Sequence, residues 1–122
     1  MTWFKRVQEP DRAFYSILTR EDQALIGNAG FVDIDSVLRM AEIRITLGHP
    51  DTWGKGYGTE AMRLMLQEAT QRGYAMVYLF VFDDNLRAIR AYEKVGFVEA
   101  GERMDPKGMG RQLRMEYSLL SA

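Results

Sequence analysis

The sequence predicts an α/β fold in which helices pack on a sheet of mixed strand direction. Apolar residues recur at helical spacing over 59–72 and again between Asn85 and Gly96, and a continuous apolar run lies between these segments at 75–82. Apolar and polar residues alternate over 41–47 and over 111–120, as they do in half-buried strands. Strands therefore precede, separate and follow two helices.

The first third of the chain predicts a hairpin. Residues 13–19 are rich in aromatic and β-branched side chains, 20–23 has the composition of a turn, and 24–35 resumes as a strand. Gly27 and Gly30 lie in that second strand, where they would tolerate a bulge or the close approach of another group. The expected order is three or more mostly antiparallel strands, a helix, a strand, a helix and a closing hairpin.

The centre of the sheet and the helix ends can also be predicted. A strand such as 75–82, which is apolar on both faces, usually lies inside a sheet with helices covering it. Gly73 allows the first helix to end in a left-handed conformation, and Asn85 is placed to cap the start of the second.

Composition narrows the class of protein. A chain of 122 residues that is 47% hydrophobic suits one domain over 1–122 with a single core. The net charge of -1 predicts neither nucleic-acid nor anionic-membrane partners. With no cysteine and one histidine, His49, we expect no metal site and no disulfide. A segment of about 20 apolar residues and a signal peptide are both missing from the sequence, so we expect a cytoplasmic protein.

The segment from Trp53 to Thr59 has the character of an anion-binding loop. Its glycines occupy every second position between a predicted strand and a predicted helix, so backbone amides and the positive end of the helix dipole face the same point. Such a loop suits a pyrophosphate, although a merely tight connection has the same composition. Thr59-Glu60 replaces the Lys-Ser or Lys-Thr pair of a nucleoside triphosphate loop, and the repeated βαβ pattern of dinucleotide-binding folds is missing.

Two blocks of sequence resemble a known family. The segment Trp53-Gly54-Lys55-Gly56-Tyr57-Gly58 is similar to the pattern Arg/Gln-x-x-Gly-x-Gly/Ala, and residues 85–97 are similar to Asn-x-x-Ala-x-x-x-Tyr-x-x-x-Gly-Phe. In this order, with an apolar strand between them, they resemble the GNAT superfamily of acyl-coenzyme-A N-acyltransferases. Trp53 stands in place of the usual Arg or Gln, as in the ribosomal-protein-alanine and polyamine acetyltransferase branch.

The resemblance implies an activity. A GNAT enzyme transfers acetyl from acetyl-CoA to a primary amine in a direct ternary complex, and this chain has no cysteine to form an acyl-enzyme. The acceptor is left open among a protein N-terminus, a polyamine and another small amine. A non-catalytic acyl-CoA-binding module and a GNAT-fold interaction domain are the alternatives.

The resemblance also implies roles for single residues. Tyr92 is the expected general acid for the coenzyme A thiolate, and a core tyrosine is its alternative. Glu42 is the expected base, with a solvated strand carboxylate as the alternative, and Asp33 and Asp35 are expected near the acceptor. The predicted coenzyme A contacts are Ile43, Ile45, Leu47, Trp53, Gly54, Lys55, Gly56, Tyr57, Gly58, Thr59, Asn85, Ala88 and Tyr92.

The start of the chain departs from the family pattern. GNAT domains open with a strand and helices that wall the acceptor site, whereas only residues 1–11 precede the strand expected at 13–19. We expect 3–7 to be the remnant of the last of those helices and 13–19 to form an exposed sheet edge. An exposed edge favours association, so a homodimer or larger assembly is predicted, with apolar surface from the four aromatic residues at this end. These are Trp3, Phe4, Phe14 and Tyr15.

Overall fold

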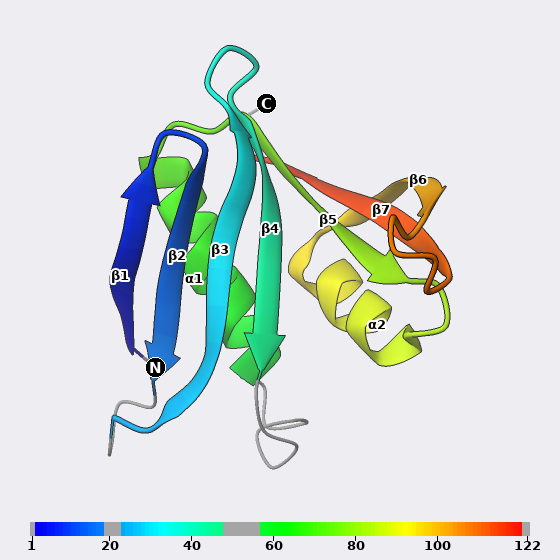
Figure 1. Cartoon of the computed structure of the whole chain (residues 1–122), viewed down its shortest axis with the longest axis horizontal. Helices are drawn as coiled ribbons and strands as arrows, with labels where there is room; N and C mark the ends of the chain where they lie inside the picture. Colours follow the sequence, from blue (N-terminus) through cyan, green and yellow to red (C-terminus); the bar gives the residue numbers. More distant parts are fainter. Residues whose placement is uncertain (1, 19–22, 48–56, 121–122) are drawn as a thin grey trace.

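The computed structural model describes residues 2–18, 23–47 and 57–120. These residues form one mixed sheet of seven strands and two helices that pack on it (Figure 1). The predicted α/β class is confirmed. The elements are β1 (Thr2–Glu9), β2 (Arg12–Leu18), β3 (Leu25–Asp35), β4 (Met40–Leu47), α1 (Tyr57–Gln71), β5 (Met76–Phe82), α2 (Leu86–Val95), β6 (Val98–Met104) and β7 (Arg111–Ser118).

The sheet has the order β1-β2-β3-β4-β5-β7-β6. Neighbouring strands are antiparallel except β4 and β5, which are parallel and are joined by the crossover through α1. A parallel pair needs such a crossover because its strands start at the same end of the sheet. The predicted hairpin is confirmed by the β2–β3 register, in which Phe14 pairs with Gly30; residues 19–22 lie outside the described ranges.

The parallel pair is short, and this divides the sheet. Its register runs from Met40↔Met76 to Glu42↔Tyr78 and then ends, although β4 continues to Leu47 and β5 to Phe82. In Figure 1 the two strands meet near the top and separate toward the bottom, where β4 ends and α1 begins. A larger half, β1 to β4, is thus joined to a smaller half, β5 to β7, along three residue pairs.

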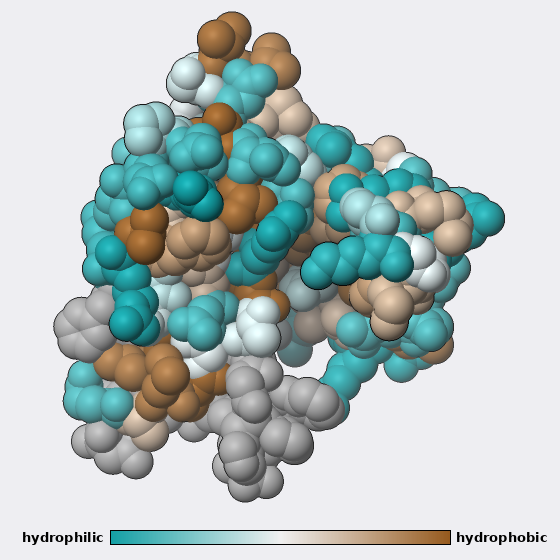
Figure 2. Space-filling view, in the orientation of Figure 1, coloured by the Kyte–Doolittle hydropathy of each residue, from teal (hydrophilic) through white to brown (hydrophobic). Residues whose placement is uncertain are grey.

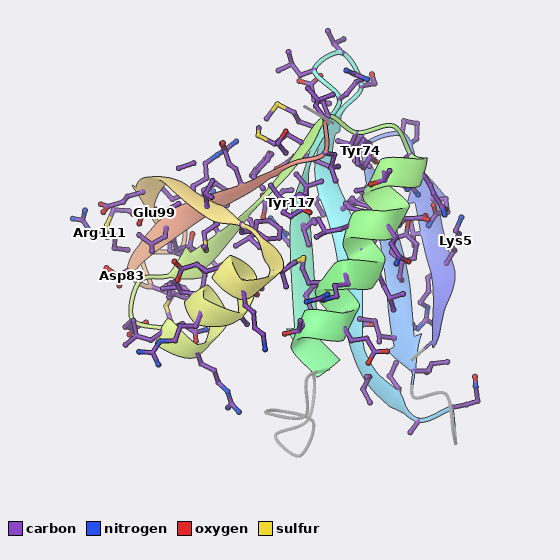
Figure 3. The ribbon with its side chains drawn as sticks, turned by 180° about the vertical axis from the view of Figure 1, so that it is seen from behind. Lys5, Tyr74, Asp83, Glu99, Arg111 and Tyr117 are labelled. Carbon is purple, nitrogen blue, oxygen red and sulfur yellow. The ribbon has the colours of Figure 1, made fainter. Side chains whose placement is uncertain are left out.

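Both helices cover the same face of the sheet. Alternate strand residues such as Tyr15, Phe31, Ala41 and Val77 are buried in one core with the apolar stripe of α1, and the inner residues of α2 pack against that core. From behind, α1 crosses in front of the larger half (Figure 3). The stripe of α1 consists of Ala61, Met62, Met65, Leu66 and Ala69, which supports the helical periodicity seen in the sequence.

The opposite face carries no helix within the described ranges. The prediction that helices cover β5 is therefore only half right: β5 lies inside the sheet, but Tyr78, Phe80 and Phe82 on its second face stay half-buried beneath long side chains. Arg103 stacks 3.4 Å over the Phe80 ring and Arg114 3.9 Å over the Tyr78 ring. Figure 2 shows the matching face of the larger half, where hydrophobic and hydrophilic residues are mixed.

Two predictions for the start of the chain are wrong. Residues 3–7 are part of β1 rather than of a helix, and β1 pairs with β2, so that β1 and not 13–19 is the sheet edge. The cause is the segment Glu9-Pro10-Asp11-Arg12: Pro10 fixes a turn that returns the chain as a hairpin, with Glu9 paired to Arg12. Tyr15, expected on an adhesive surface, is fully buried.

A buried polar network fastens the β1–β2 hairpin to α1. The Tyr15 hydroxyl donates to Glu68 Oε2 at 2.6 Å, Arg72 Nε donates to the Tyr15 hydroxyl at 3.1 Å, and Lys5 Nζ lies 3.5 Å from Glu68 Oε2. Arg72 also donates to Gln8 Oε1 of β1. Burial alone raises the pKa of Glu68, but the Tyr15 hydrogen bond and the charges of Lys5 and Arg72 bring it below its ordinary value.

No helix in the described part of the chain is both long and apolar enough to cross a membrane.

Glu68→Gln should destabilise the protein in a pH-dependent way. Since folding lowers the pKa of Glu68, its stabilisation is complete above the ordinary value of 4.5 and is lost as the pH falls through the folded-state value. We expect a loss of about 1–3 kcal/mol in the free energy of unfolding at neutral pH, shrinking in acid, as measured by urea denaturation. Glu99→Gln, on exposed β6, is the matched control and should have no effect. A Glu68→Gln penalty independent of pH contradicts this account.

Candidate active site

The candidate site lies where β4 and β5 separate. Alternation along β4 buries Ala41 and Ile43 under α1 and turns Glu42, Arg44 and Thr46 to the face without helices. Beyond Glu42 the edge of β4 that faces β5 is no longer joined to it by the strand register. Ile43, Ile45 and Leu47, the predicted contacts for the arm of coenzyme A, lie along this edge, which is what a strand-like backbone interaction with a ligand requires.

Glu42 is buried, with 5% of its surface exposed. Its Oε2 accepts a hydrogen bond from Arg44 Nε at 3.0 Å, and the Arg44 side chain is mostly exposed. The alternative of a solvated strand carboxylate is therefore wrong. A buried carboxylate is costly unless it is paired, so its retention at the strand split marks Glu42 as a candidate for proton transfer or for binding a cation.

Tyr78 is a neighbour that sequence reasoning missed. It pairs with Glu42 across the parallel strands, which places both side chains on the face without helices. Burial raises the pKa of Tyr78, and the negative charges of Glu42 and Asp33 raise it further, while Arg114 and Arg103 lower it. Tyr78 could have been noticed because it carries the one hydroxyl group in the otherwise apolar segment 75–82.

Asp33 reaches this neighbourhood because β3 is irregular. The β3–β4 register shifts between Val32 and Asp35, and Asp33 has a left-handed backbone with φ of 50°. Aspartate tolerates that conformation better than most residues. Asp35, by contrast, caps the adjoining turn, because its Oδ1 accepts hydrogen bonds from the amides of Val37 and Leu38. Of the two carboxylates predicted near the acceptor, only Asp33 contributes to the raised pKa of Tyr78.

The second helix begins as predicted. The Asn85 side-chain oxygen accepts from the Ala88 amide at 3.3 Å, so Asn85 caps the helix, and Ala88 is half-buried one turn later. The capping explanation of Asn85 is thus correct. This hydrogen bond uses the side-chain oxygen of Asn85 and not its NH2 group, and the cofactor contact expected of this residue stays a prediction.

Tyr92 packs with the core from the helical face. Its ring lies 6.0 Å from the Phe97 ring between centroids, and burial raises its pKa. A phenol whose pKa is above 10 is protonated at neutral pH, the form in which it can donate a proton. Glu42 and Tyr92 therefore lie on opposite faces of the sheet.

The glycine-rich loop is described only at its end. Trp53, Gly54, Lys55 and Gly56 lie outside the described residues, and α1 starts at Tyr57, two residues before the start expected from periodicity. Gly58 and Thr59 fall in its first turn and are half-buried. The end of β4 and the amino end of α1 lie at the same end of the sheet (Figure 1), so the predicted phosphate loop connects them where the strands diverge.

A parallel strand pair thus separates beside the amino end of a helix, with a buried carboxylate at the point of separation. Residues 1–98 match the family described as the acetyltransferase (GNAT) domain. The chain belongs to the GNAT acetyltransferase family, as the two sequence blocks indicated.

Among curated proteins, the chain is 37% identical over 79 residues to the spermidine N(1)-acetyltransferase of Escherichia coli K12, covering 64% of this chain and 42% of the relative. It is 28% identical over 93 residues to the N-acetyltransferase YobR of Bacillus subtilis, covering 76% of this chain and 36% of the relative. The chain thus spans less than half the length of these relatives.

Solved structures give the same grouping. A chimera of the spermidine N-acetyltransferase of Vibrio cholerae superposes with a TM-score of 0.81 at 25% identity, covering 88% of this chain and 67% of that chain. A structure titled as the dodecameric spermidine N-acetyltransferase of the same organism has a TM-score of 0.79, covering 88% of this chain and 65% of that chain. Both structures are spermidine N-acetyltransferases by title, which is one of the two kinds of acetyltransferase that Trp53-Gly54-Lys55-Gly56 resembles, the other being the ribosomal-protein-alanine acetyltransferases.

Proposed function

We propose that residues 1–122 form one catalytic domain that transfers acetyl from acetyl-CoA to a primary amine in a direct ternary complex. Membership of the GNAT family supports the reaction class, and the observation that carries the proposal is the buried Glu42 at the point where β4 and β5 separate. A non-catalytic binding module has no need of a buried carboxylate there. Direct transfer is the simplest route for a chain without cysteine.

Acetyl-CoA fits the residues of this site. The edge of β4 from Ile43 to Leu47 offers backbone groups to the pantetheine arm, and the loop at 53–59 with the start of α1 offers amides to the pyrophosphate. The predicted helix contacts, Asn85 and Ala88, lie in the first turn of α2. When bound, acetyl-CoA supplies an activated thioester as the acyl donor.

The two catalytic roles follow from the protonation states of the site. An amine acceptor is mostly an ammonium ion at neutral pH, so Glu42 takes a proton from it, directly or through a water molecule, and leaves a nucleophilic nitrogen. Tyr92, kept protonated by burial, donates a proton to the thiolate as the C–S bond breaks, and the second proton that the nitrogen loses as the amide forms restores the phenol. Glu42 removes its proton on the open face and Tyr92 supplies one from the helical face, so the base does not take the proton of the acid.

The acceptor we infer is a small cationic amine of the polyamine type. The negative charges of Glu42 and Asp33 both raise the pKa of Tyr78, so two carboxylates lie in the neighbourhood of this phenol. Two of the relatives described above are spermidine acetyltransferases by name. A protein N-terminus, which carries a single positive charge, uses this arrangement less fully than a polyamine does.

Turnover with a panel of amines tests this function, and Tyr92→Phe tests its mechanism. Spermidine and related polyamines should be acetylated faster than peptides with a free N-terminus. Tyr92→Phe should keep acetyl-CoA affinity but lower kcat by roughly 10²-fold or more, because the proton donor is removed. Thiol release with a colorimetric reagent and calorimetry with acetyl-CoA measure the two quantities. A near-normal kcat in the Phe variant contradicts the role of Tyr92.

Glu42→Gln should change the shape of the pH–rate profile. A base must be deprotonated to act, so the rising limb of kcat/KM belongs to it and should disappear or move in the variant. The profile is measured with spermidine at saturating acetyl-CoA. Arg44→Gln, which loses the hydrogen bond to Glu42 but keeps the carboxylate, serves as the control and should retain a rising limb. Identical profiles for the parent and Glu42→Gln exclude Glu42 as the base.

We further propose that the chain forms a homodimer or larger assembly. The reason is not an exposed edge at β2, which β1 covers, but an exposed apolar turn. The turn between β3 and β4 presents Val37, 88% exposed, and Leu38, 60% exposed, and Figure 2 shows hydrophobic atoms gathered at this tip. The dodecameric neighbour supports association within this structural group. Apolar side chains at a protruding tip are typical of a contact between protein chains.

The double variant Val37→Glu with Leu38→Glu should shift the chain toward monomer, because buried charge at an interface is costly. Sedimentation equilibrium at micromolar concentration measures the shift, and Met104→Glu, on the similarly exposed β6, is the control. A parent chain that sediments as a monomer overturns the proposal.

A further inference from the structure

The Tyr78 side chain is fixed in place by its neighbours. The Arg114 guanidinium lies 3.9 Å above its ring, and Arg114 is itself held by Glu116, whose Oε2 accepts from Arg114 Nε at 2.8 Å. The Phe80 ring packs against Tyr78 at nearly right angles, with centroids 5.9 Å apart. A stack of this kind determines the direction of the phenol as well as its position.

The hydroxyl at the end of this fixed ring has no hydrogen bond with any residue within 2–18, 23–47 and 57–120. The other tyrosine hydroxyls that contact side chains in these ranges, those of Tyr15 and Tyr74, serve the network at α1. Packing therefore accounts for the ring of Tyr78 but not for its oxygen, since phenylalanine would make the same stack with Arg114 and Phe80.

The surroundings of this oxygen hold charges of both signs, because Arg44 on the same face of β4 pairs with Glu42. Tyr78 is paired in register with Glu42, at the last position before β4 and β5 separate, and Asp33 acts on it from β3. Arg114 and Arg103 face it from β7 and β6. A cation that approaches Glu42 from the open face also meets the neighbouring Tyr78, a neutral phenol whose lone pairs are able to accept.

We propose that the Tyr78 hydroxyl is an acceptor-contacting group, which binds an N–H of the cationic amine and holds its nitrogen beside Glu42. This inference rests on the proposed acetyl transfer and assigns a specificity-determining residue to the same site. The phenol takes no proton. It accepts one hydrogen bond from the amine while Glu42 takes a different proton, so that the nitrogen lone pair is formed in a fixed direction.

Tyr78→Phe tests the inference, because it keeps the stack with Arg114 and Phe80 and removes only the hydroxyl. We expect the KM for spermidine to rise about tenfold, in line with the loss of a hydrogen bond to a charged group. Acetyl-CoA affinity and the urea midpoint should stay unchanged. Tyr74→Phe is the matched control: the Tyr74 hydroxyl accepts from Arg72 at 3.4 Å near the carboxyl end of α1 (Figure 3), its ring packs on buried Phe31 on the helical face, and its loss should leave the KM as it is.

A second measurement separates this inference from the proposed function. Calorimetric titration of spermidine into the CoA-saturated protein should show about tenfold weaker binding in Tyr78→Phe than in the parent. Normal turnover by the parent, with equal KM and equal binding in Tyr78→Phe, overturns the inference alone. A parent that neither binds nor acetylates any amine of the panel overturns the inference together with the proposed function.

Discussion

The short parallel pairing of β4 with β5 is the constraint on which the rest of the molecule depends. Because the strands run in the same direction, α1 must cross the sheet between them, and this places its amino end beside the end of β4. Because the pairing stops at Glu42↔Tyr78, the remaining edge of β4 is available to a ligand. The end of this pairing therefore positions the parts of the proposed site that β4, β5 and the start of α1 contribute, whereas α2 contributes Asn85 and Tyr92 separately.

The two faces of the sheet divide the proposed chemistry. On the helical face, apolar packing raises the pKa of Tyr92 and keeps it neutral. On the open face, aromatic rings, guanidinium groups and carboxylates share the surface, and Glu42 is buried among them. The proposed acid and the proposed base, which need opposite surroundings, thus lie on opposite faces of the sheet.

Local features of the fold could be predicted, and features that depend on distant partners could not. The α2 cap at Asn85, the left-handed Gly73 and the alternation of β4 depend on nearby residues, and the structure has each of them. The hairpin of β1 with β2 was missed because its local evidence is the four-residue turn 9–12, and residues 3–7 before it were expected to be the remnant of a helix. Glu42 was chosen from strand alternation and a family pattern, and its catalytic role stays a prediction, whereas Tyr78 was hidden in an apolar run.

The sequence by itself determined the family, through the spacing of glycines at 54–58 and of Asn85, Tyr92 and Gly96, because the family pattern consists of residue types at fixed local intervals. It also determined which strands are amphipathic. Only the tertiary structure decided that Glu42 is buried, that Tyr78 is its partner on the neighbouring strand and that Asp33 lies close enough to raise the pKa of Tyr78. Those facts depend on strand register and on a bulge, and register is set by the packing of one whole face against the helices rather than by any single segment.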